Sequence, residues 1–85
     1  MSDWKETKLL SGESHLSKTF VFADFSEAFA FVTRVALLAE QQNHHPWWSN
    51  NWNTVEFRLF THSEGNIITK KDRVLASSID KLIKP

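Results

Sequence analysis

The sequence predicts an α+β domain with a four-stranded antiparallel sheet and helices packed on one face. Three observations predict it: a long central segment free of glycine and proline, alternating apolar residues in the segments on either side, and a shorter segment of helical spacing at the end. Their order is strand, strand, helix, strand, strand, helix. Because 85 residues are too few for two cores, we expect residues 1–85 to form a single domain.

The first predicted element is a β-hairpin near the N-terminus. Residues 4–10 mix polar and apolar side chains, and residues 11–14, Ser-Gly-Glu-Ser, supply a turn. In the strand that follows, apolar side chains alternate on one side at Leu16, Phe20 and Phe22. We expect that side to face the core.

The central segment predicts a helix over residues 26–42. Asp24 is a candidate N-cap, with Glu27 three residues later. Polar residues recur every seven positions as a narrow stripe, which leaves apolar side chains around most of the helix. These are Ala28, Phe29, Phe31, Val32, Val35, Ala36, Leu38 and Ala39. Since one sheet covers only one side of a helix, we expect self-association to cover the rest.

The second half predicts another hairpin and a closing helix. Asn43 and Pro46 should end the long helix, because the residue before a proline is pushed out of the α region. Residues 54–62 alternate strongly. Val55, Phe57 and Leu59 point one way, and Glu56, Arg58, Phe60 and His62 the other. Thr69 and Asp72 resemble a capping box that opens the last helix, whose apolar face is Leu75, Ile79, Leu82 and Ile83.

Composition excludes several classes of protein. Ten Lys and Arg balance ten Asp and Glu, so no strong field would attract nucleic acid or an anionic membrane. Without cysteine the chain has no disulfide, no thiolate nucleophile and no cysteine-based zinc site. No stretch reaches the roughly 18 apolar residues of a membrane span. We expect a cytoplasmic protein without a membrane partner or a direct nucleic-acid partner.

A cluster of histidines is the main functional signal. His44, His45 and His62 flank one predicted hairpin, whereas His15 lies near the first turn. Histidine both gives and takes a proton near neutrality, so several around one pocket suit general acid–base catalysis. Alternatively, His44 and His45 only terminate a helix, where histidine favours the carbonyl-rich end. The residues alone leave both interpretations open.

A metal site is a second interpretation of the same residues. His44, His45 and His62, with Glu40 or Asp72, are acceptable ligands for zinc or iron. Consecutive histidines rarely aim at one point, however, and no His-x-x-x-His pattern appears. We therefore expect no metal and no cofactor.

Three tryptophans, Trp47, Trp48 and Trp52, lie within six residues. Some should be core, but one could form the wall of a pocket for a flat heteroaromatic ligand. Before any family is considered, Asp72 is most simply the acid of the capping box. Glu40 is most simply part of the polar stripe of its helix.

The segment from Glu40 to Pro46, Glu-Gln-Gln-Asn-His-His-Pro, opens a longer motif. The pattern is an acid, three positions, His-His-Pro, five or six positions, an aromatic residue, nine positions, His, a variable gap and Asp. Its slots are filled by Glu40, His44, His45, Pro46, Trp52, His62 and Asp72. In this motif, and over nearly its whole length, the chain resembles the pterin-4a-carbinolamine dehydratases.

The resemblance implies an enzyme that dehydrates 4a-hydroxytetrahydropterin to quinonoid dihydropterin. It implies that His44 and His62 handle protons while His45 holds and orients the pterin. Glu40 and Asp72 would form hydrogen bonds in the site or orient its other groups, and Trp48 would help to shape the pocket. The substrate-binding residues that the resemblance implies are Glu40, Asn43, Pro46, Trp48, Trp52 and Asp72.

The resemblance also implies a homo-oligomer, because the family forms tetramers built from dimers. Family members usually carry an N-terminal helix before the first strand, whereas this chain begins almost directly at Trp4, so we expect that helix to be missing. A rival interpretation is a non-enzymatic, oligomeric interaction module that keeps the fold. Such a module has no reason to hold three histidines, an acid and an aromatic residue at family spacing.

Overall fold

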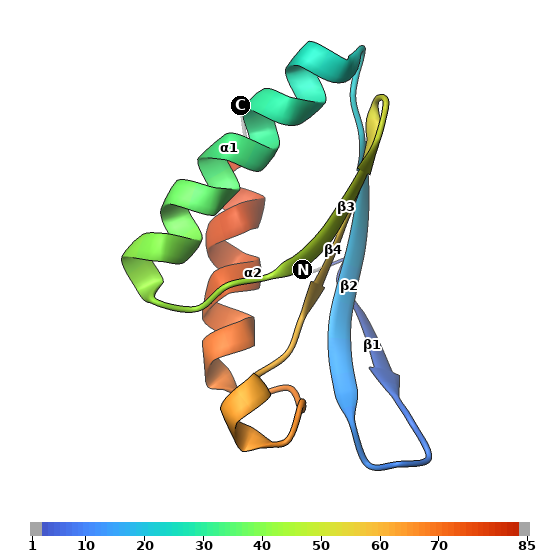
Figure 1. The fold of residues 1–85 in the computed structure, drawn as a ribbon, viewed down its shortest axis with the longest axis vertical. Coiled ribbons are helices and arrows are strands. Elements are labelled where there is room, and N and C mark those ends of the chain that lie inside the picture. Colours follow the sequence, from blue (N-terminus) through green and yellow to red (C-terminus); the bar gives the residue numbers. More distant parts are fainter. Residues whose placement is uncertain (1–2, 84–85) are drawn as a thin grey trace.

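The computed structural model describes residues 3–83, which form one antiparallel sheet with two helices on the same face (Figure 1). The elements are β1 (Lys5–Lys8), β2 (Ser14–Val21), α1 (Phe25–Gln42), β3 (Trp47–Asn51), β4 (Thr54–Leu59), a 3₁₀ helix (His62–Glu64) and α2 (Lys70–Ile83). The strand order is β1-β2-β4-β3. The predicted α+β fold class is confirmed. No helix in the described part of the chain is long and apolar enough to cross a membrane.

The core lies between the sheet and the two helices. β2 and β4 pair at the centre, with Leu16 opposite Leu59 and Phe20 opposite Val55. Alternate residues of β4 face the helices, as the sequence predicted, because side chains of a strand point to opposite faces. The buried apolar residues are Leu16, Phe20, Ala28, Phe31, Val32, Val35, Ala39, Val55, Phe57, Leu59, Leu75, Ala76 and Ile79.

Capping residues set both ends of α1. The Asp24 carboxylate accepts a hydrogen bond from the Glu27 amide at 2.8 Å, which confirms the predicted N-cap. At the other end Asn43 adopts a left-handed conformation (φ 51°), and its amide reaches the Ala39 and Glu40 carbonyls. The chain therefore leaves the helix sharply at Asn43, and the next two residues turn toward the sheet.

The predicted last strand was too long at its C-terminal end. β4 stops at Leu59, and His62 begins the 3₁₀ helix instead of closing the strand. Beyond Leu59, the start of β2 pairs with the loop before α2 instead of with β4. Ser14 makes hydrogen bonds to Asn66 and Ile68 of that loop. His62 therefore lies beyond the end of the sheet, not on its outer face with Glu56 and Arg58.

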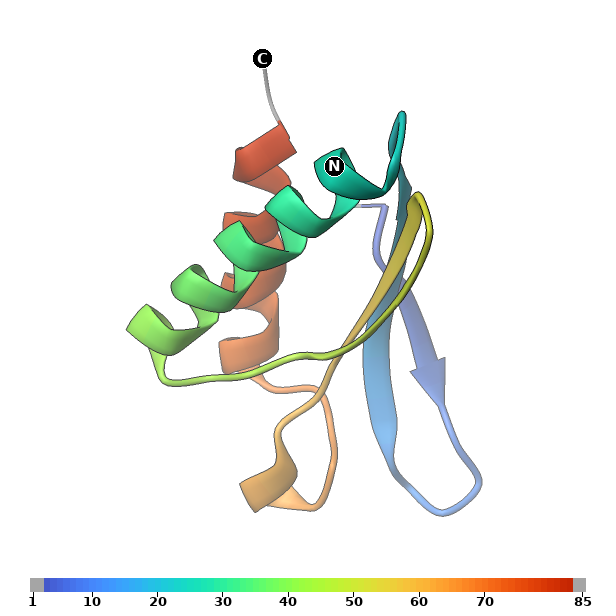
Figure 2. The same cartoon turned by 45° about the horizontal axis from the view of Figure 1, so that its top comes forward.

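The helix α2 begins where the capping box was predicted. The Asp72 carboxylate accepts from the Thr69 amide at 2.8 Å, and the Thr69 hydroxyl accepts from the Lys71 amide at 3.3 Å. α1 and α2 cross the same sheet face in opposite directions (Figure 2). The end of α1, the 3₁₀ helix and the start of α2 consequently lie at one end of the molecule (Figure 1).

Candidate active site

A cavity of about 330 Å³ lies where these three segments meet. It is lined by Asn43, His44, His45, Phe60, Thr61, His62, Ser63 and Lys71, and is called the histidine cavity below. All three histidines singled out in the sequence line it, although 17 positions separate His45 from His62. Its volume falls within the usual range for small-molecule sites.

His44 is held by a buried carboxylate. Its Nε2 lies 2.5 Å from Asp72 Oδ1, and the side chains are 11% and 0% exposed. Asp72 Oδ2 accepts from the Thr61 hydroxyl and the Thr69 amide, each at 2.8 Å. Because an ionised carboxylate only accepts, His44 Nε2 carries a hydrogen and leaves Nδ1 for other partners.

Asp72 is fully buried and in contact with His44. This position fits the orienting role, which is one of the two roles that the resemblance implies for Asp72. Its part in the cap of α2 is also present, so the simple structural explanation and the orienting role coexist in one side chain.

His62 is held by a neutral amide. Its Nδ1 lies 2.9 Å from Asn66 Oδ1, and Asn66 Nδ2 donates to Glu13 Oε2 at 3.1 Å. Since the Asn66 oxygen accepts, His62 Nδ1 carries the hydrogen and its Nε2 is the free nitrogen. Glu13 lies in the turn between β1 and β2, so this turn supports His62 through Asn66.

His45 is exposed, as His62 is, whereas His44 is half-buried. His45 Nε2 lies 2.8 Å from Glu40 Oε1, and the two side chains are 58% and 79% exposed. His45 lines the histidine cavity and also a second hollow of about 230 Å³. That hollow, between α1 and β3, is lined by Val32, Ala36, Ala39, Glu40, His45, Pro46, Trp48 and Phe57.

The three tryptophans lie in different surroundings in the structure. Trp48 joins Glu40 and Pro46 in the hollow beside His45. The Trp47 ring stacks under the Arg58 guanidinium, 4.5 Å from its centroid. Trp52 lies in the turn after β3, at the far end of that strand from His45, and lines neither cavity. The structure therefore does not bring Trp52 to the histidines.

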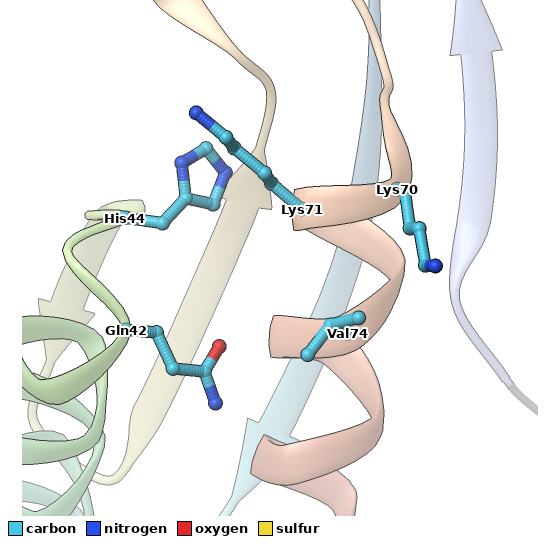
Figure 3. A pocket seen from close by; sticks show the side chains of 5 residues that line it. All are labelled: Gln42, His44, Lys70, Lys71 and Val74. Carbon is cyan, nitrogen blue, oxygen red and sulfur yellow. The ribbon is translucent and has the colours of Figure 1, made fainter.

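Sequence reasoning missed Thr61, Asn66 and Lys71 as parts of the site. Thr61 continues the inward alternation of β4 and is 2% exposed, so a buried hydroxyl beside His62 was the available signal. Asn66 follows Gly65, a pairing typical of a turn, and its sequence context carries no further signal. Lys71 lines the histidine cavity and a neighbouring one of about 370 Å³, where its side chain extends past the His44 ring (Figure 3).

Within residues 3–83, no group of three or more histidine or acidic side chains is arranged to hold a metal ion. Within the same residues, His44 and His62 each have one ring nitrogen that contacts a protein partner and one that makes no hydrogen bond. The arrangement can give and take protons on a ligand in the cavity.

The chain is thus an α+β protein with a cavity that holds two separately anchored histidine rings. The chain belongs to the pterin 4 alpha carbinolamine dehydratase family, whose sequence profile matches residues 1–82. The predicted family resemblance is thereby confirmed.

Individual relatives agree with this family. A Rhodospirillum rubrum protein is 43% identical over 83 residues, covering 98% of this chain and 85% of its own. A Bradyrhizobium protein is 48% identical over 82 residues, covering 96% and 78%. Both carry the provisional name pterin-4-alpha-carbinolamine dehydratase.

Two solved structures share the fold. A Brucella melitensis protein described as a transcriptional coactivator/pterin dehydratase has a TM-score of 0.81 and 38% identity, covering 93% of this chain and 82% of its own. A pterin dehydratase-like protein described as a RuBisCO assembly factor in the alpha-carboxysome has a TM-score of 0.76 and 25% identity, covering 96% and 89%.

Proposed function

We propose that this protein dehydrates 4a-hydroxytetrahydropterin to quinonoid dihydropterin. The observation that carries the proposal is the meeting of His44, His45 and His62 in one cavity, with His44 and His62 each anchored through one ring nitrogen. In the reaction the 4a-hydroxyl takes a proton and leaves as water, while a ring nitrogen of the pterin loses a proton. The C–O bond breaks, a double bond forms, and no electrons are exchanged with another molecule.

The two anchors divide the proton transfers between His44 and His62. The negative charge of Asp72 stabilises a positive charge on His44, which suits His44 to deliver the proton to the departing hydroxyl. Asn66 is neutral, so His62 is suited to act as the base through its free Nε2. The pair returns to its starting state when a proton passes from His62 to His44 through solvent.

The remaining site residues position the ring in this proposal. His45 lies between the histidine cavity and the hollow that contains Glu40, Pro46 and Trp48, so it can orient the pterin from the side. Asn43 lines the histidine cavity at the end of α1. The pterin is the substrate, and no further cofactor or metal is part of the proposed reaction.

The cellular setting is also proposed. We propose a cytoplasmic homo-oligomer, a dimer or a tetramer, that acts without a direct nucleic-acid or membrane partner. The balanced charge of the chain and its bacterial relatives support this setting.

A non-enzymatic interaction module is the second candidate. The observation that favours it is the structural neighbour described as a RuBisCO assembly factor, which has a related fold. An assembly module would need none of the anchored histidines. The buried carboxylate that holds His44 and the half-buried amide that holds His62 therefore favour the enzyme.

Kinetics of histidine variants test the proposed function. General acid–base catalysis by one group is worth about 10²–10⁴-fold, so His44→Ala and His62→Ala should each lower kcat by about that factor. His45→Ala should act mainly on KM, because this residue positions the substrate. The measurement follows by absorbance the dehydration of 4a-hydroxytetrahydropterin made chemically or enzymatically. His15→Ala is the control, since His15 lies in β2 and does not line the histidine cavity.

The two candidates give opposite results. If His44→Ala and His62→Ala both keep kcat within about twofold of the parent, with unchanged circular dichroism, the proton-transfer roles are wrong. The interaction module would then be the better explanation.

A further inference from the structure

Thr61 is a buried hydroxyl in contact with the group that holds His44. It is 2% exposed and lies one residue before His62. Its Oγ1 is 2.8 Å from Asp72 Oδ2 and 2.6 Å from Thr69 Oγ1. A chain of contacts therefore runs from Thr69 through Thr61 and Asp72 to His44.

The donor and acceptor of each hydrogen bond in this series follow from the Asp72 carboxylate at one end of it. The Asp72 carboxylate only accepts, so Thr61 donates its single hydroxyl hydrogen to Oδ2. The short contact between the two hydroxyls then requires Thr69 to donate to Thr61. Thr69 Oγ1 in turn accepts from the Lys71 amide at 3.3 Å. Every hydrogen in the chain thus points toward Asp72.

Two donors on Oδ2 leave Oδ1 of the same carboxylate for His44 Nε2. We infer that Thr61 is a positioning residue for the proposed dehydration. Its hydroxyl fixes the Asp72 carboxylate so that His44 keeps its hydrogen on Nε2 and presents Nδ1 to the ligand. The inference rests on the proposed function for its effect on rate, but the state of the His44 ring is a property of the protein alone.

A purely structural role for Thr61 is the competing explanation, because buried hydroxyls are usually paired for stability. The two explanations differ in what a valine would do. Valine has nearly the shape of threonine, and the Thr69 amide still binds Oδ2, so the cap of α2 remains. The carboxylate would, however, lose one of the two donors that fix its rotation.

The first test compares Thr61→Val with Thr61→Ser in the dehydration assay. Supporting groups around a reactive side chain are typically worth about 10–100-fold in activity, so Thr61→Val should lower kcat by about 10-fold with KM nearly unchanged. Thr61→Ser keeps the hydroxyl and should stay within about twofold of the parent. Thr54→Val is the matched control, since Thr54 begins β4, the strand that precedes Thr61, and lies outside the histidine cavity.

A double substitution shows whether Thr61 acts through His44. In a His44→Ala background, Thr61→Val should cause no further loss of kcat, because the ring that it positions is absent. An equal loss in both backgrounds would overturn the inference. So would an unchanged kcat in Thr61→Val alone.

Nitrogen-15 NMR of the histidine rings gives a readout that needs no activity. The parent protein should show His44 as the Nε2–H form, and Thr61→Val should show a mixture of ring forms. A parent His44 ring whose only hydrogen lies on Nδ1 would overturn the inference even if Thr61→Val does not fold. If the parent lacks dehydratase activity but shows the Nε2–H ring, the proposed function fails. The positioning of His44 by Thr61 and Asp72 would still stand.

Discussion

At the scale of single residues, the chemistry of the site depends on what holds each histidine. His44 has a fully buried carboxylate, His62 has a neutral amide, and His45 has an exposed carboxylate. An exposed ion pair contributes little and leaves its ring free to move, whereas a buried partner fixes both orientation and tautomer. The three rings therefore enter the cavity with different hydrogen-bond partners and different freedom to move.

The substitution Asp72→Asn tests the anchor of His44. If the Asn oxygen takes over the bonds from Thr61 and Thr69, its amide nitrogen faces His44 Nε2 and forces the ring hydrogen onto Nδ1. Because a neutral amide no longer stabilises the positive charge that His44 carries before it delivers a proton, we expect kcat to fall by about 10²–10⁴-fold with little change in secondary structure. The measurement is the dehydration assay together with circular dichroism.

Asp80→Asn is the matched control for this prediction. Asp80 lies in the same helix and binds Trp4 and Lys18, away from the histidine cavity. It should keep the parent kcat, although it should lower stability. A parent-like kcat in Asp72→Asn would contradict the role of the carboxylate.

The histidines and two of their partners, Glu40 and Asp72, could be found from the sequence, but Asn66 and the supporting Thr61 could not. Histidine is rare and chemically distinctive, so three near one predicted hairpin stand out. Thr61 and Asn66 are ordinary residues of strands and turns, and their role arises only when the loop after β4 closes. That loop closes through a bridge between Thr61 and Ile67, a long-range detail that alternation does not encode.

At the scale of elements, capping signals located helix boundaries better than alternation located strand ends. Asp24 and Thr69 fixed the start of α1 and α2 within a residue or so, because a cap is a local hydrogen bond. Alternation continued through Thr61, whose side chain does point inward, and so extended the strand past Leu59. The end of β4 depends on what lies beside it, and this is set by the distant Ser14.

The left-handed residue at the end of α1 gives a prediction about stability. Asn43 has φ 51°, a conformation that costs a residue with a Cβ about 1 kcal/mol or more, and that asparagine and glycine tolerate best. Asn43→Ala should therefore lower the free energy of unfolding by about 1 kcal/mol, whereas Asn43→Gly should change it much less. Urea unfolding at one fixed protein concentration measures both. Equal losses in the two variants would show that the side chain, not the backbone conformation, stabilises this end.

At the scale of the whole molecule, activity should not depend on a metal ion. The proposed dehydration needs only two proton transfers, and the histidine nitrogens that face Asp72 and Asn66 are already engaged. Activity should survive dialysis against a strong chelator, measured by the same assay with and without added zinc. Stoichiometric zinc in the purified protein, with activity lost on its removal, would instead indicate a metal-dependent hydrolase.

The surface of α1 predicts self-association. Phe25 and Phe29 stack on each other at 5.7 Å, yet each is about half exposed, and Leu37 is 67% exposed. Beside this helix face, β3 is a sheet edge that carries no charged side chain, and its Trp47 and Trp48 are also exposed. Natural proteins usually protect such edges with charges or cover them. A chain of this size has a small core, so burying this apolar surface against further copies would add to its stability.

We therefore expect an oligomer, most simply a tetramer, in sedimentation at micromolar concentration. Phe29→Glu places a charge among the exposed apolar residues of α1 and should reduce the assembly to smaller species. Arg34→Glu is the control, because Arg34 is exposed on the polar stripe of the same helix and its replacement should leave the assembly intact. A parent protein that sediments as a monomer of 9.9 kDa would contradict the prediction, and would also weaken the proposed function, because the family resemblance implies a homo-oligomer.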